Sequence, residues 1–136
     1  VLDAKLPHLD TYNKARIKAA NAYDKAFEGH ENIITPHRDG DEDNHVFHQY
    51  TLKVKGVSRD ALVKHLGEKG IPCGVYYPIP LHLQKAYKDS RYNEKDFAVT
   101  NQLVKEVISL PMHTELDDEQ IEFITSTVIN FVNANS

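Results

Sequence analysis

The residue types best suited to chemistry gather in two short segments of this chain. Residues 45–49 carry two imidazoles and a side-chain amide, and residues 74–84 carry two tyrosines, two prolines, a histidine and a glutamine. Prolines fix the backbone shape, while aromatic rings and imidazoles present flat faces with hydrogen-bonding tips. On residue types alone, residues 74–84 suit the wall of a binding site and a stiff connector equally well.

The eight histidines raise the question of a metal site, above all the pair His45-x-x-His48. The residues around this pair alternate as in a strand, where positions three apart point to opposite faces. The chain also lacks Cys-x-x-Cys and His-Glu-x-x-His spacings, so we expect no metal site. The position of His48 on an otherwise apolar face by itself favours the interpretation of a buried histidine that is hydrogen-bonded to the backbone. Cys73 is expected to pack in the protein interior rather than to react.

Composition limits the classes of function. A length of 136 residues favours one domain, and a net charge of -4 without a basic run gives no reason to expect nucleic-acid binding. No apolar stretch approaches ~18 residues, so we expect no membrane span. The single cysteine excludes an internal disulfide and fits a reducing compartment, which indicates the cytoplasm.

The first part of the chain predicts a helix followed by a polar loop. Apolar residues recur at spacings of three and four over residues 2–27, which is typical of one helical stripe. Pro7 predicts a kink and Gly29 an end. Residues 31–44 predict a solvated loop with a short strand at 32–35.

The middle of the chain predicts strand, helix and strand. Residues 45–55 alternate, with Val46, His48, Tyr50, Leu52 and Val54 on one face and Phe47, Gln49, Thr51 and Lys53 on the other. Ser58 predicts the N-cap of a helix that runs to residue 69, and Gly70 its C′ residue. A short strand is expected at residues 73–77.

The last part predicts helical turns at residues 81–87, a helix at 97–107, a strand at 108–112 and a final helix capped by Asp117. Short strands between helices indicate an α+β fold. We expect a small, mostly antiparallel sheet with helices packed on one side.

Three ordered blocks resemble one known family. They are His45-Val46-Phe47-His48-Gln49-Tyr50, then Gly70-Ile71 with residues 74–84, then Ser109-Leu110-Pro111-Met112-His113 with Glu115-Leu116. Their order and spacing resemble the C-terminal small domain of DegT/DnrJ-type aminotransferases that use pyridoxal 5′-phosphate (PLP). The match covers essentially the whole chain, with residues 2–27 similar to the helix that links the large domain to the small one and residues 31–133 to the α+β domain.

The resemblance implies fold type I, a homodimer, and transfer of an amino group from glutamate to a keto group of a nucleotide-linked sugar. It also implies that PLP forms its Schiff base with a lysine of a large domain upstream of Val1, so the catalytic domain is absent here. The isolated chain is then expected to be inactive. The form of residues 76–84 is most similar to members that aminate 3-keto sugars, including uronates, for surface polysaccharides; other branches make amino sugars for antibiotics.

Carried over residue by residue, the resemblance implies a functional role for His48 in place of a buried one. The residues implied to face substrate or cofactor are His48, Gln49, His45, Phe47, Tyr76, Tyr77, His82 and Gln84. An alternative is a free-standing binding or regulatory domain without catalysis, and a third reading is a scaffold module without a ligand. The opening Val1-Leu2-Asp3, without a start methionine, favours a chain cut from a longer enzyme.

Overall fold

The computed structural model describes residues 2–38, 40 and 45–136. Helices and strands follow in the order α1 Leu2–Lys5, η1 Leu6–His8, α2 Leu9–Phe27, β1 Ile33–Ile34, β2 Tyr50–Val54, α3 Arg59–Glu68, η3 Leu81–Leu83, η4 Lys85–Tyr87, η5 Glu94–Phe97, α4 Ala98–Glu106, β3 Val107–Leu110 and α5 Asp118–Asn135. Of the polar loop predicted at residues 31–44, residues 39 and 41–44 lie outside the described residues.

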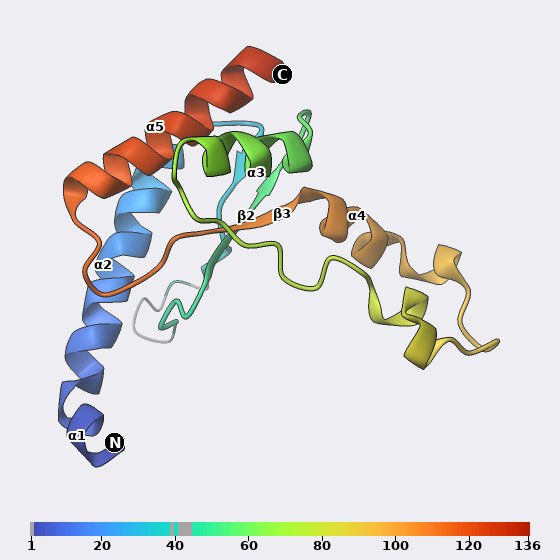
Figure 1. Cartoon of the computed structure of the whole chain (residues 1–136), viewed down its shortest axis with the longest axis horizontal. Coiled ribbons are helices and arrows are strands. Elements are labelled where there is room, and N and C mark those ends of the chain that lie inside the picture. Colours follow the sequence, from blue (N-terminus) through green and yellow to red (C-terminus); the bar gives the residue numbers. More distant parts are fainter. Residues whose placement is uncertain (1, 39, 41–44) are drawn as a thin grey trace.

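The sheet is antiparallel throughout, in the order β1-β2-β3. Helices α2, α3 and α5 pack together over one face of it (Figure 1). Directly paired residues such as Leu52 and Ile108, or Ile33 and Val54, are buried on this face. The opposite face carries Thr51 and Lys53 of β2, which are only half-buried. The expected α+β fold, with a small sheet and helices on one side, is confirmed.

Capping signals place the helix ends where the sequence predicts them. Ser58 accepts a hydrogen bond from the Ala61 amide at 3.2 Å, and Asp117 with Gln120 forms a reciprocal capping box before α5. At the end of α3, the Ile71 amide donates to the Leu66 carbonyl at 2.9 Å. This is the hydrogen bond of a Schellman motif, in which the residue after the C-cap adopts a left-handed conformation.

Pro7 divides the first helix as expected, since a 3-10 turn at Leu6–His8 separates α1 from α2. Figure 1 shows this end of the chain extending away from the body, and its apolar side chains are exposed, with Leu2 at 82% and Leu6 at 67%. The predicted stripe therefore becomes buried only in the second half of α2, where Tyr23 and Phe27 join the core.

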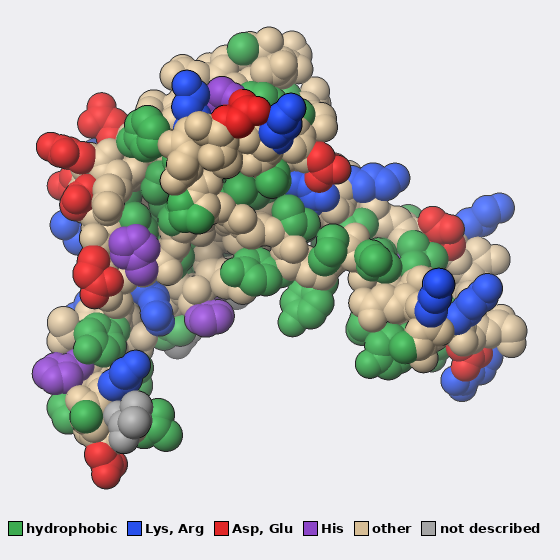
Figure 2. All heavy atoms as spheres, viewed as in Figure 1, with side chains coloured by type: hydrophobic (Ala, Val, Ile, Leu, Met, Phe, Trp, Pro, Cys, Tyr) green, Lys and Arg blue, Asp and Glu red, His purple; other side chains and the backbone are tan. Residues whose placement is uncertain are grey.

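A second segment also leaves the body. Residues 78–97, which we call the arm, extend to the side of the molecule opposite α2 before the chain returns through α4 (Figure 1). The predicted helical turns at 81–87 are two short 3-10 turns. Hydrophobic side chains, including Ile79, Leu81 and Tyr87, are exposed along this segment, and Figure 2 shows such side chains gathered there.

The prediction of a strand at residues 73–77 is wrong. Only Gly74 pairs with β3, through two hydrogen bonds with Ser109 of 2.8 and 2.9 Å. Tyr77 adopts a positive φ of 56°, and the residues that follow include Pro78 and Pro80, which have no N–H to donate to a neighbouring strand. These features end the pairing after one residue.

Two exposed glycines, one inside α3 and one just after its C-cap, are expected to respond to alanine substitution with opposite signs. Gly70 has φ +74°, so Gly70→Ala is expected to destabilise the chain by about 1 kcal/mol. Gly67 lies inside α3 with open space around its Cα, so Gly67→Ala is expected to stabilise by up to about 1 kcal/mol. Urea unfolding of both variants measures the two effects, and equal signs would contradict this C-cap.

Candidate functional site

The segment that leads into β2 follows a different path from the predicted strand. Tyr50 is the first strand residue, and Phe47 adopts a left-handed φ of 46° although it is not glycine. Such a conformation costs about 1–3 kcal/mol and persists only where surrounding contacts hold it. The Phe47 ring is 1% exposed, so its burial in the core offsets the cost.

The side-chain alternation that holds from Tyr50 onward does not extend back to this left-handed residue. Phe47 is buried, whereas Val46 and His48 are exposed. The prediction that His48 shares the core face with Tyr50 is therefore wrong, and so is the interpretation of His48 as a buried histidine. The error arises because residues 48 and 49 form a bend, so the period of two that holds from Tyr50 onward does not extend back to them.

The bend brings His48 and Gln49 to the same hollow, a cavity of about 310 Å³. The prediction that they face opposite sides is thus also wrong. The other wall comes from the segment around Gly74 and from the end of β3, and its residues are Pro72, Cys73, Gly74, Tyr76, Ser109, Leu110, Pro111, Met112 and His113. Imidazole, amide, phenol and hydroxyl groups therefore converge in one place, next to the open face of the sheet.

Hydrogen bonds fix the far wall of this hollow. Ser109 pairs with Gly74 through both backbone bonds, and its hydroxyl lies 2.6 Å from the hydroxyl of Thr51. The Tyr23 hydroxyl donates to the Pro111 carbonyl at 2.9 Å, which ties the end of β3 to α2. A side chain at Gly74 would meet the Tyr76 ring at 2.8 Å, so glycine allows this ring its position.

The structure does not bring all the predicted site residues together. His45 lies against Phe47, with ring centroids 4.0 Å apart, and its Nδ1 accepts the Phe47 amide at 3.0 Å. Phe47 itself is part of the core. Tyr77 is 81% exposed and is not among the residues that line the hollow.

His82 and Gln84 lie in the arm. The His82 ring stacks on Phe97 at 4.2 Å, and the Gln84 amide donates to the Ile79 carbonyl at 3.1 Å. Three of the eight predicted residues, His48, Gln49 and Tyr76, therefore meet at the hollow.

Cys73, Ser109 and His113 also line the hollow, although their residue types and spacing did not predict a site role. The family resemblance could have identified two of them, because Ser109 and His113 belong to its third block. Burial raises the pKa of the Cys73 thiol, which disfavours the thiolate and hence a nucleophilic role.

The lysines of this chain do not fit a PLP Schiff base. Such a lysine needs neighbouring charges or a sheltered pocket that lower its pKa. All twelve lysines are described; eleven are exposed and Lys53 is half-buried.

Within the described residues, no three His, Cys, Asp or Glu side chains are grouped so that they could hold a metal ion. None of the helices in that part of the chain combines the length and the apolar character that a membrane span requires.

Comparison with known proteins agrees with the fold and with the spacing of the three blocks. The model of the DegT/DnrJ/EryC1/StrS aminotransferase family matches residues 1–129. The chain belongs to this family. Its members that match here are longer, and the chain spans about a third of the length of the curated relatives.

Two relatives and one solved structure illustrate the match. A pleiotropic regulatory protein of Geobacillus stearothermophilus is 38% identical over 133 residues, which cover 96% of this chain and 35% of that protein. A UDP-N-acetyl-3-dehydro-alpha-D-glucosamine 3-aminotransferase of Acidithiobacillus ferrooxidans is 36% identical over 128 residues, which cover 94% of this chain and 33% of that protein. The structure of S. venezuelae DesV with a ketimine intermediate superposes with a TM-score of 0.87 at 29% identity, covering 97% of this chain and 35% of that one.

The reversed alternation predicts unequal stability effects at three consecutive residues. Phe47→Ala removes a buried ring and is expected to cost about 3–5 kcal/mol. His48→Ala and Gln49→Ala remove side chains that line an open hollow and are expected to change the free energy of unfolding by no more than about 0.5 kcal/mol. Chemical denaturation of the three variants measures this; a loss at His48 as large as that at Phe47 would contradict the described path.

Proposed function

We propose that this chain is the small domain of a PLP-dependent aminotransferase that transfers an amino group from glutamate to a keto group of a nucleotide-linked sugar. The observation that carries the proposal is the convergence of His48, Gln49 and Tyr76 on one solvent-open hollow. Family membership over residues 1–129 supports it. The alternative of a free-standing regulatory domain is not favoured, because the matched family is one of aminotransferases.

In the proposed enzyme the cofactor chemistry belongs to the remainder of the protein. PLP, when bound, supplies an electron sink for the amino-group transfer, and the absence of a sheltered lysine here supports a Schiff-base lysine in a preceding large domain. Residues 2–27 would then link the two domains, and residues 31–133 would form the small one. The exposed Leu2 and Leu6 support this, since an exposed apolar stripe is typical of a surface that meets another part of the protein.

The groups at the hollow suit a sugar more than an amino acid. A glutamine amide offers two donors and one acceptor, and an imidazole offers one donor and one acceptor when it is neutral. Gln49 and His48 can therefore each bond to sugar hydroxyl groups, and the ring of Tyr76 gives a flat apolar face beside them. Among the described residues, those that line this hollow include no Asp or Glu, whereas His113 adds a second imidazole.

The substrate class that we favour is a 3-keto sugar attached to UDP, which includes uronates. The name of the A. ferrooxidans relative supports a 3-keto substrate at 36% identity. The product would be an amino sugar for a surface polysaccharide or a related glycan, made in the cytoplasm by a homodimer.

Kinetics of the full-length protein test this function. His48→Ala and Gln49→Ala are each expected to lower kcat/KM for the amino acceptor by about tenfold or more, because each removes a positioning hydrogen bond. The melting temperature should stay unchanged. Lys18→Ala serves as the control, since its side chain is 80% exposed and Lys18 is not among the residues that line the hollow.

Unchanged kcat/KM in both site variants, with the same acceptor and with glutamate as donor, would contradict a role for this hollow. Absence of transamination by the wild-type protein with any 3-keto nucleotide sugar would contradict the substrate class.

A further inference from the structure

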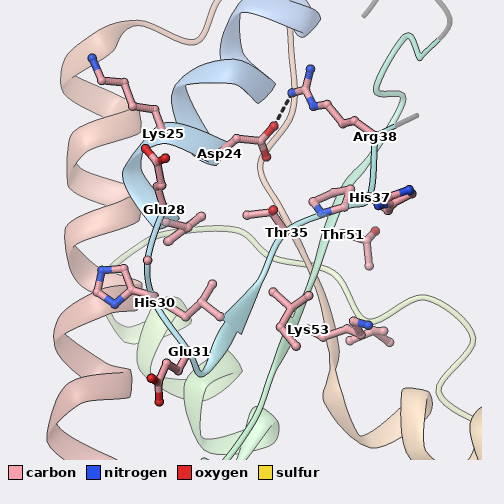
Figure 3. Close-up of a pocket in the computed structure, with 16 residues that line it drawn as sticks. Asp24, Lys25, Glu28, His30, Glu31, Thr35, His37, Arg38, Thr51 and Lys53 are labelled. Atoms are coloured by element: carbon pink, nitrogen blue, oxygen red, sulfur yellow. Dashed lines mark ion pairs between the residues drawn. The ribbon is translucent and has the colours of Figure 1, made fainter. Parts of the chain in front are cut away.

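One carboxylate joins three segments that are distant in sequence. Asp24 lies on α2, Arg38 follows β1, and Tyr50 begins β2. The Tyr50 hydroxyl donates to Asp24 Oδ1 at 2.6 Å, and Arg38 Nη2 lies 2.5 Å from Asp24 Oδ2. Figure 3 shows the Asp24 and Arg38 side chains pointing toward each other at a cavity of about 1200 Å³, which Thr51 and Lys53 also line.

The same arginine reaches the residue with left-handed backbone. The guanidinium carbon of Arg38 lies 4.5 Å from the centroid of the Phe47 ring, which is a cation–π contact. The His45 ring contacts this phenylalanine as well, at 4.0 Å. Phe47 is therefore held through its ring, and Tyr50, three residues later, is held through its hydroxyl.

Between these two anchored residues lie only His48 and Gln49. A two-residue bend with both ends fixed has few conformations, and here both of its residues line the hollow. The alternation breaks between the left-handed Phe47 and Tyr50, so the contacts that hold the Phe47 ring also constrain the path of the backbone into His48.

We propose that Asp24 and Arg38 are positioning residues, which hold Phe47 and Tyr50 and thereby direct His48 and Gln49 into the substrate hollow. This assignment rests on the proposed function for its catalytic consequence. The contacts themselves stand independently of it. Neither residue lines the hollow, so any effect on the substrate passes through the bend.

The geometry explains why this position requires arginine. A guanidinium is planar and delocalised, so it can pair with a carboxylate through one nitrogen while its face lies over an aromatic ring. A lysine would keep the charge beside Asp24 but would lose the planar contact with Phe47. Arg38→Lys therefore separates the ion pair from the ring contact, and Asp24→Asn removes the ion pair while an amide oxygen can still accept from Tyr50.

Hydrogen exchange of the full-length protein tests the contacts without relying on activity. Arg38→Lys and Asp24→Asn are each expected to speed exchange of the peptide that covers residues 45–49 by about tenfold, through local opening. Exchange in β3 should stay unchanged. Lys18 lies on the same helix as Asp24 and forms an exposed ion pair with Asp118 of α5. Lys18→Ala removes this pair and should change the exchange rate of neither segment.

Unchanged exchange at residues 45–49 in both variants would overturn the proposal. Equal acceleration in β3 would also overturn it, because it would indicate a general loss of stability. Since Arg38→Lys keeps the charge beside Asp24, it serves as the decisive variant if Asp24→Asn does not fold.

A double-mutant cycle tests the catalytic consequence. In the wild-type background, Arg38→Lys is expected to lower kcat/KM for the amino acceptor by about tenfold, because the bend is displaced. In a background that carries both His48→Ala and Gln49→Ala, the same change should have an effect of less than about twofold, since residues that act through one another are not additive. An equal effect in both backgrounds would overturn the positioning role.

The two proposals fail in different ways. If His48→Ala leaves kcat/KM unchanged, the function proposed for the hollow is wrong, while the exchange of residues 45–49 still decides whether Asp24 and Arg38 hold the bend.

Discussion

The hydrogen bond from the Tyr50 hydroxyl to Asp24 is the interaction on which most of this structure depends. It joins the long helix α2 to the first residue of the central strand, beside the ring contact of Tyr50 with Tyr23 at 4.8 Å. Burial, and then the bond to Asp24, raise the pKa of Tyr50 far above its ordinary value, so the hydroxyl remains protonated as the donor. This bond fixes the start of β2, from which Tyr50, Leu52 and Val54 alternate onto the buried face of the sheet.

The open surfaces follow from this arrangement. The chain's own helices cover one face of the sheet, whereas Thr51 and Lys53 lie on the other, and both the start of α1 and the arm extend beyond the core (Figure 1). A domain that exposes so much apolar side chain, as Figure 2 shows for the arm, is built to contact other parts of a protein. The chain spans about a third of the length of its curated relatives, and in the proposed enzyme the large domain would meet these surfaces.

The helices, their ends and the fold class could be predicted from the sequence, because capping residues such as Ser58 and Gly70 act over a few neighbouring positions. The path of residues 45–49 could not. There, Phe47 adopts a left-handed backbone, and its ring contacts Arg38, His45 and the core. Those partners come from tertiary contacts that no local alternation reveals. The family blocks did identify His48 and Gln49, although the strand pattern assigned them to opposite faces.

The central claim is that the hollow lined by His48, Gln49 and Tyr76 is the small-domain wall of a nucleotide-sugar site. The most direct test is a crystal structure of the full-length protein with PLP and a UDP-linked 3-amino sugar bound. The account predicts side chains of His48 and Gln49 within about 4 Å of the sugar, with Phe47 still left-handed and in contact with Arg38. A sugar bound without contact to any residue of this hollow would contradict it.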